Sequence, residues 1–319
     1  MKILDVYGKE DLAKVYIARM RDDDGFLVEF VESTQPPIPL EKKWVLIVSS
    51  LFGCPVKCKM CDAGGKYSGK LETDEILGQI DYMVRRRFPD RKVPIPKFKI
   101  QFARMGEPSM NMNVLNALDK LPQIYDAPGL IPSVSTVAPK SSGDFLDRLI
   151  EIKDRHYPNG RFQLQFSIHS TNPIHRDELI PVKKWSFDEI AEYGARFHKE
   201  GDKKITLNFA GAMGYDVEPD IVRKHFDPDL FLIKLTPLNP TVRVKESELE
   251  SMIDPYDSTS AKGIVDGFKQ NGYDVILSIG EVEENKIGSN CGQFLTRYRT
   301  TQTRIKEGYD TQKYKLISN

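Results

Sequence analysis

The stretch Cys54-Pro-Val-Lys-Cys58-Lys-Met-Cys61 decides the fold prediction, because three of the four cysteines of the chain stand there, directly after the apolar residues 44–48. A 4Fe-4S cluster is normally held by four thiolates, so three would leave one iron open to a small chelating molecule. A structural zinc site is the alternative, but zinc needs a fourth Cys or His nearby. The next such residue after Cys61 is His156. The motif therefore favours a cluster with an open iron.

Composition indicates a protein of the cytoplasm. A chain of 319 residues suits one large domain or two smaller ones. Its 46 basic and 46 acidic residues balance, so any contact with RNA would have to be local. The clustered cysteines do not form a secreted disulfide framework, and neither a signal peptide nor an apolar stretch of membrane-spanning length is present. We therefore predict a cytoplasmic location and no membrane partner.

Short apolar strands alternate with helical patterns over residues 44–280. Strands are expected at residues 44–50, 97–102, 131–137, 162–169, 204–209 and 230–236, with a further strand at 275–279. Helices are expected to begin near residues 73, 111, 143, 186, 219 and 260, and Ser186 with Glu189 has the form of a capping box. Parallel strands need crossovers. The pattern thus predicts an α/β fold, a partial (β/α)6 TIM barrel.

The two ends of the chain are predicted to be extensions of this barrel. Residues 1–43 are expected to form a β-hairpin extension around the turn at residues 21–25, and residues 281–319 a C-terminal segment with Cys291 and a basic and aromatic tail. The tail residues are Tyr298, Arg299, Arg304, Lys306, Tyr309, Lys313, Tyr314 and Lys315. With Arg85-Arg86-Arg87, they form either a stacking surface for single-stranded RNA or solvated faces.

Polar residues follow the expected strands at their carboxyl ends, where barrels of this kind carry their chemistry. The cysteine motif follows the first strand, Gly106-Glu107-Pro108 the second and Ser135-Thr136 ends the third. Ser167-Ile168-His169 ends the fourth, and Pro237-Leu238-Asn239-Pro240 follows the sixth. We expect these residues at one rim. Taken singly, Gly-Glu-Pro is also a common turn and His169 also a core histidine.

Together these motifs resemble the radical SAM enzymes, and among them the adenine methyltransferases RlmN and Cfr. The matching residues are Met105-Gly-Glu-Pro108 with Asn111, Ser135-Thr-Val137, Ser167-Ile-His169 with Arg176-Asp-Glu178, Leu238-Asn-Pro240 and Asn290-Cys-Gly-Gln293. They occur in the family's order over roughly residues 25–300. The resemblance implies a radical SAM core barrel and an enzyme with a 4Fe-4S cluster and S-adenosylmethionine. It also implies an electron donor such as flavodoxin or ferredoxin.

The resemblance also implies a role for each matching residue. Cys54, Cys58 and Cys61 would bind the cluster. Gly106 and Glu107 would hold the amino group of S-adenosylmethionine, and Ser135, Ser167, Ile168, His169 and Asn239 would contact its ribose and carboxylate. Cys291 would be methylated by one S-adenosylmethionine, and a 5'-deoxyadenosyl radical from a second would activate that methyl for addition to adenine. From its residue type alone, Cys291 is a nucleophile or an ordinary buried cysteine.

The sequence departs from the family at three places. Ile47, seven residues before Cys54, stands where the family has a cysteine that helps to release the product. About forty residues precede the barrel, where the family has a helical domain that engages RNA and supplies a glutamate base. The acidic run Glu281-Val-Glu-Glu284 replaces a more basic stretch. An adenine in RNA is therefore the first substrate prediction and a small heteroaromatic metabolite the second. A glycyl-radical activating enzyme and a zinc- or cluster-binding interaction module are the rivals.

Overall fold

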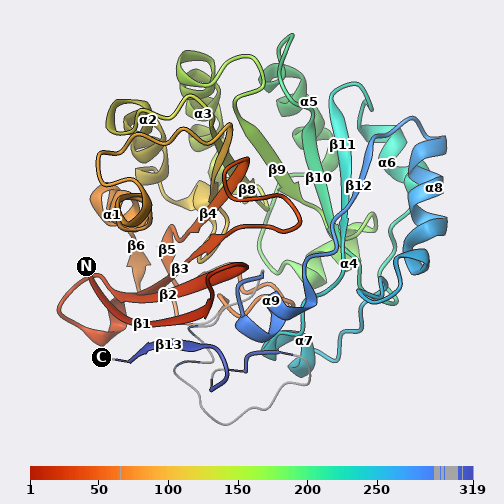
Figure 1. The fold of residues 1–319 in the computed structure, drawn as a ribbon. Helices are drawn as coiled ribbons and strands as arrows, with labels where there is room; N and C mark the ends of the chain where they lie inside the picture. Colours follow the sequence, from red (N-terminus) through yellow and green to blue (C-terminus); the bar gives the residue numbers. More distant parts are fainter. Residues whose placement is uncertain (65, 291–294, 296–297, 299–307, 311, 319) are drawn as a thin grey trace.

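A computed structural model describes residues 1–64, 66–290, 295, 298, 308–310 and 312–318 of the chain. Seven strands form the parallel part of one large sheet. They are β4 (Lys43–Val48), β7 (Lys97–Phe102), β8 (Leu130–Thr136), β9 (Gln163–Ser167), β10 (Ile205–Ala210), β11 (Phe231–Thr236) and β12 (Val275–Leu277), and they lie side by side in chain order. This arrangement confirms the predicted partial barrel (Figure 1).

The predicted helices lie between these strands and pack on the outer face of the sheet (Figure 1). They are α1 (Thr73–Arg87), α2 (Asn113–Ile124), α3 (Gly143–His156), α5 (Phe187–Phe197), α6 (Pro219–His225) and α8 (Lys262–Gln270). Helix α5 begins as its sequence predicts, because Ser186 and Glu189 bond to each other's backbone N–H groups at 3.2 and 2.6 Å. The capping box therefore sets the start of this helix.

Alternate residues of each parallel strand build the main core. Trp44, Leu46 and Val48 of β4 are buried in one cluster with Phe98, Ile100 and Phe102 of β7 and with Ile76, Ile80 and Met83 of α1. Successive side chains of a strand point to opposite faces. The residues between these apolar positions, such as Lys99 and Gln101, therefore face the interior of the barrel.

Four antiparallel strands extend the sheet beyond β4. They are β3 (Leu27–Ser33), β2 (Ala13–Arg19), β1 (Lys2–Lys9) and β13 (Lys315–Ser318), in that order. Strands β2 and β3 occupy the segments where a hairpin is expected, whereas β1 and β13 were not predicted. The last described strand thus returns to pair with the first (Figure 1). The division of the chain at residues 43 and 280 stays a prediction.

Three unpredicted short helices follow strands at their carboxyl ends. They are α4 (Pro173–Leu179), α7 (Val242–Glu246) and α9 (Val282–Ile287), and all three lie toward the lower side of Figure 1. The remaining elements are the pair β5 (Leu51–Phe52) and β6 (Gly69–Lys70) and the 3-10 turns Asp24–Phe26, Pro108–Met110, Lys140–Ser142 and Ser258–Ala261. Within the described ranges, no helix has the length and apolar character needed to cross a membrane.

Candidate active site at the carboxyl ends of the barrel strands

The cysteine loop leaves the barrel after β4 and carries three cysteines. Cys54 is buried, and Cys58 and Cys61 are half-buried. Gly53 allows the loop to turn, because it adopts a φ of +79° and a Cβ there would lie 2.1 Å from the carbonyl oxygen of Lys66. The tight loop therefore depends on glycine immediately before the first cysteine.

Two of the unpredicted helices brace this loop. The backbone N–H of Lys59 donates to the carbonyl of Leu179 at the end of α4 (2.9 Å), and Thr241 Oγ1 donates to the carbonyl of Met60 (3.0 Å). Next to Cys61, the Asp62 carboxylate accepts the N–H groups of Val242 and Arg243 at 3.0 and 2.8 Å, at the start of α7. Segments from the ends of two other strands, β9 and β11, thus fix the position of the cysteine loop.

The chemistry of this loop fits a cluster better than a single metal ion. In the described part of the chain, no three Cys, His, Asp or Glu side chains converge closely enough to hold one ion. A 4Fe-4S cluster does not require such convergence, because each thiolate binds a different iron. Burial raises the pKa of the Cys54 thiol to about 11, while the backbone N–H groups of Val56, Glu107 and Lys57 bond to its sulfur and oppose the shift. Such donors stabilise a thiolate ligand.

Gly106 and Glu107 connect the end of β7 to the cysteine loop and to β8. Gly106 has a φ of +100°, and a Cβ there would lie 2.4 Å from Cβ of Leu51. The buried Glu107 carboxylate accepts from Ser109 N and Oγ at 3.1 and 2.7 Å, from Thr136 Oγ1 at 2.5 Å and from Val137 N at 2.9 Å. Burial raises its pKa, and these bonds oppose the shift. Its predicted contact with an amino group remains a prediction.

The Ser167-Ile168-His169 motif is held against the neighbouring strand β10. The N–H groups of Ile168 and His169 donate to the carbonyl of Asn208 at 2.9 and 3.3 Å, and His169 Nδ1 accepts the N–H of Ala210 at 3.0 Å. Burial, with a smaller contribution from Arg176, lowers the pKa of His169 to about 4. The imidazole is therefore neutral near pH 7, with its second ring nitrogen carrying the proton.

The other predicted cofactor contacts lie at the same end of the sheet. Ser135 lies next to the last residue of β8, and Asn239 lies in the connection from β11 to α7. The carbonyl of Asn239 accepts the N–H of Thr241 at 2.8 Å, and Thr241 in turn bonds to Met60 of the cysteine loop. The strand-end motifs thus share one end of the barrel with the cysteines, although their contacts with a bound cofactor stay predictions.

Comparison with known proteins supports this interpretation of the site. The chain is 24% identical over 258 residues to a probable dual-specificity RNA methyltransferase RlmN of Petrotoga mobilis, which covers 79% of this chain and 68% of that protein. It is 29% identical over 211 residues to RlmN of Marinobacter nauticus, which covers 64% of this chain and 53% of the relative. The chain is a distant homologue of the RlmN methyltransferases. No family model matches the sequence.

Solved structures show the same fold. A radical SAM methyltransferase from Sphaerobacter thermophilus superposes with a TM-score of 0.71 at 19% identity, covering 92% of this chain and 80% of that one. At this level of identity the superposition shows a shared fold, and the 4Fe-4S cluster and S-adenosylmethionine stay predictions for this chain. The chain spans between about half and two thirds of the length of the RlmN relatives, 53% of one and 68% of another.

Ile47 replaces the second cysteine of the RlmN pattern with an apolar contact. It lies on β4 opposite Val31 of β3. Its half-buried side chain packs against the same apolar cluster as Cys58, Met60 and Cys61. This position therefore lies on the side of the sheet that carries the cysteine loop, but it offers no thiol.

Cys291 lies outside the described residues, but the residues on both sides of it are held by one buried ion pair. Arg104, which follows β7, lies 2.7 Å from the Glu29 carboxylate, and both side chains are almost inaccessible to solvent. Arg104 also donates to the carbonyls of Gly288, Ser289 and Asn290 at 2.6, 3.0 and 2.5 Å. Glu29 accepts the N–H of Leu295. This ion pair was not predicted from the sequence, although Arg104 stands two residues before Gly106.

The tail does not present the tyrosines that an RNA-stacking surface needs. Tyr309 and Tyr314 are buried, and their hydroxyls donate to Asp62 at 3.1 Å and to Glu283 at 2.7 Å. Tyr298 donates to Asp5 at 2.8 Å. Arg299, Arg304 and Lys306 lie outside the described residues. A stacking role for the two buried tyrosines is therefore wrong, because their rings pack inside the protein.

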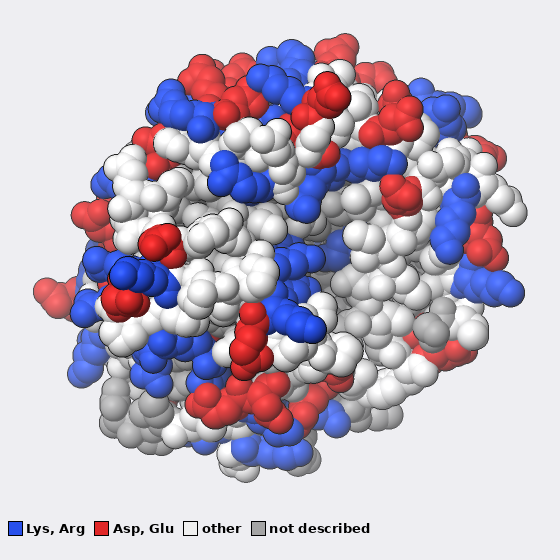
Figure 2. All heavy atoms as spheres, turned by 45° about the horizontal axis from the view of Figure 1, so that its top comes forward, with Lys and Arg blue, Asp and Glu red and all other residues white. Residues whose placement is uncertain are grey.

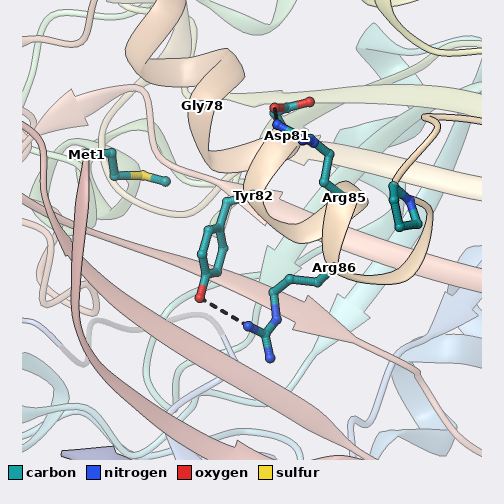
Figure 3. A pocket seen from close by; sticks show the side chains of 7 residues that line it. Met1, Gly78, Asp81, Tyr82, Arg85 and Arg86 are labelled. Carbon is teal, nitrogen blue, oxygen red and sulfur yellow. Dashed lines mark hydrogen bonds and ion pairs between the residues drawn. The ribbon is translucent and has the colours of Figure 1, made fainter. Parts of the chain in front are cut away.

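The basic cluster of α1 is partly neutralised by its neighbours. Arg87 pairs with Glu32, and Arg85 lies 3.9 Å from Asp81. Figure 3 shows Arg86 directed at the hydroxyl of Tyr82, to which it donates at 3.4 Å. Only Arg87 is closely paired with a carboxylate, while Arg85 and Arg86 remain exposed.

Proposed function

We propose that this protein is a radical SAM methyltransferase whose cluster is bound by Cys54, Cys58 and Cys61. It transfers a methyl or methylene group through Cys291 to an sp2 carbon, and an adenine in RNA is its substrate. The braced loop with three cysteines on an RlmN-like barrel carries this proposal. When bound, the cluster and S-adenosylmethionine supply the methyl group and a 5'-deoxyadenosyl radical.

The residues around the loop have separate tasks in this proposal. The Glu107 carboxylate, buried behind the loop, attracts the ammonium group of the substrate S-adenosylmethionine through a charge-assisted hydrogen bond. Ser135, Ser167 and Asn239 bond to its ribose and carboxylate. The neutral His169 offers a ring N–H to the same groups, because its Nδ1 already accepts from Ala210.

Cys291 acts as the nucleophile that receives the methyl group. Arg104 and Glu29 hold described residues on both sides of it, residues 288–290 and Leu295. With Ile47 in place of a second cysteine, the product leaves with the help of an external thiol or another base. Turnover that depends on added thiol would support the first route, and turnover without it the second.

Methyl transfer is tested with S-adenosylmethionine that carries a deuterated methyl group. Reconstituted wild-type protein is expected to form 5'-deoxyadenosine and to label adenine in added RNA. C291A is expected to cleave S-adenosylmethionine but to label no RNA, and C58A to do neither. Label transfer by C291A would exclude the methyl-carrier role, and hydrogen abstraction from a partner protein by C291A would favour an activating enzyme. Zinc in place of iron, with no cleavage, would favour an interaction module.

A small heteroaromatic metabolite is the second candidate substrate. The burial of Tyr309 and Tyr314 favours it, since these residues cannot stack on RNA bases. In the same assay, label found on a small product and absent from RNA would select this candidate.

A further inference from the structure

The interior of the barrel contains an unusual set of lysines. (β/α) barrels generally fill their interior with branched apolar side chains. Here the inward positions of β4, β7 and β11 include Lys43, Lys97, Lys99 and Lys234, which alternate with outward residues of the main core. The interior of this barrel is therefore cationic where an apolar core is expected.

These lysines lie close to one another. Lys43 and Lys97 are opposite each other in the paired strands β4 and β7. The ammonium group of Lys99 is repelled by the positive charges of nearby lysines, which are Lys234, Lys43, Lys97 and Lys203. Its Nζ donates a hydrogen bond to Gln163 on β9 at 2.7 Å. Burial and this repulsion lower the pKa of Lys99 to about 7. No carboxylate of the described residues forms an ion pair with Lys43, Lys97 or Lys99, whereas the nearby Lys204 pairs with Asp274 at 2.7 Å.

Two polar side chains on β10 face the same interior with an unpaired atom each. Thr206 Oγ1 and Asn208 Oδ1 are buried and form no hydrogen bond. Asn208 lies beside Lys234 on one neighbouring strand and beside Ser167 on the other. Buried polar atoms are normally paired. The Thr206 hydroxyl can therefore donate to a ligand beside the lysines, whereas the Asn208 oxygen can only accept a hydrogen bond.

The lysines are reached from the end of the barrel opposite the cysteine loop. The three short helices at the carboxyl ends of the strands are α4, α7 and α9, and they lie on the lower side of Figure 1. The parallel strands therefore begin on the upper side of that view. Figure 2 brings that upper side forward and shows a central hollow with Lys and Arg side chains inside it. The hollow lies where the parallel strands begin, and we expect it to admit a small ligand.

We propose that this end of the barrel interior is a binding site for a small ligand with a multivalent phosphate group, held by Lys43, Lys97, Lys99 and Lys234. A phosphate offsets the repulsion among these like charges, of which Lys97 is exposed and the other three are half-buried. Its oxygens also accept charge-assisted hydrogen bonds from the lysine ammonium groups. Thr206 donates to the same ligand through its hydroxyl. The site does not depend on the proposed methyl transfer, because it uses none of the residues assigned to it.

Calorimetric titration of the purified full chain with tripolyphosphate at low salt tests the site. The wild type is expected to bind one equivalent. K99M and K97M are expected to bind about tenfold or more weakly, as the loss of one charged hydrogen bond predicts. The matched control K120M removes an exposed lysine on α2 and should bind as the wild type does. Absence of binding, or equal binding by all four proteins, would overturn the proposal.

A second measurement separates a binding role of Lys99 from a structural one. Without phosphate, K99M is expected to raise the melting temperature by about 2 °C, because it removes a buried and repelled charge. Tripolyphosphate should then stabilise the wild type more than K99M. A lower melting temperature for K99M with undiminished phosphate stabilisation would assign Lys99 a structural role and overturn the proposal. If a single-stranded RNA oligonucleotide binds and tripolyphosphate does not displace it, the small-ligand assignment is wrong.

Discussion

Arg104 connects the end of β7 to the segment that contains Cys291. The Nε atom of its guanidinium pairs with Glu29, and its two terminal nitrogens donate to the carbonyls of residues 288–290. The E29Q/R104M variant removes both charges together and so avoids leaving one buried charge unpaired. Because a misplacement of about 1 Å can lower a rate about 100-fold, we expect methylation of Cys291 to fall by about this factor while S-adenosylmethionine cleavage continues.

Mass spectrometry of the Cys291 peptide, alongside quantification of 5'-deoxyadenosine, checks this uncoupling. K120M is the control, because it changes charge on an exposed helix away from the strand ends. A parallel loss of both reactions would mean that the pair only stabilises the fold. Unchanged methylation would contradict a positioning role for Arg104 and Glu29.

Gly106 shows how one backbone position limits the site. Any side chain there would collide with Leu51 and would have to adopt a φ of +100°. We expect G106A to lower the free energy of unfolding by about 1–3 kcal/mol. G78A, at a half-buried position of α1 with no atom within 4 Å of the added Cβ, should change stability little or raise it by up to about 1 kcal/mol. Urea unfolding compares the two, and equal midpoints would refute the steric argument.

At the scale of elements, the predictable parts are those with a local signal. The strand at residues 97–102 is predicted by the alternation of apolar and polar residues. The start of helix α5 is predicted by the capping box of Ser186 and Glu189. Helices α4 and α7 have only seven and five residues, too few for a helical period to be visible. They are defined by the caps Asn172 and Thr241 and by contacts with the cysteine loop. The sequence therefore predicts the cysteine loop at a strand end but not the elements that brace it, and the roles of the site residues stay predictions.

The strand-end motif around His169 predicts a dependence of stability on pH. Its pKa is about 4 in the folded protein and near 6.5 in the unfolded chain. Between these values the unfolded chain binds more protons, so stability is lost as pH falls from about 6.5 to 4. The loss over the whole range is up to about 3 kcal/mol.

Urea unfolding of cluster-free protein between pH 4 and 7.5 measures this dependence. H169N should show a flatter profile than the wild type, because its replacement side chain does not titrate. H198Q, which changes a histidine at the end of α5, should retain the wild-type slope in this range. Identical profiles for H169N and the wild type would contradict the assignment of a neutral buried imidazole.

At the scale of the whole molecule, the assembly of the strands into one sheet determines features that local sequence patterns do not predict. The segment Lys97-Phe-Lys-Ile-Gln-Phe102 predicts a strand, but only the barrel shows that its lysines face inward. Pairing of β13 with β1 connects residues more than 300 positions apart, which no local pattern reveals. The order of the strand-end motifs predicted the shared rim, because parallel strands bring their carboxyl ends together. The lysine-lined interior had no such signal.

The methyl-carrier role of Cys291 is the central claim, and mass spectrometry of anaerobically purified protein tests it most directly. The peptide containing Cys291 is mapped before and after reconstitution with iron, sulfide and S-adenosylmethionine. We predict a mass gain of one methyl group on Cys291, despite the apolar Ile47. An unmodified Cys291 in a protein that still forms 5'-deoxyadenosine would contradict the account and indicate a radical SAM enzyme with a different reaction.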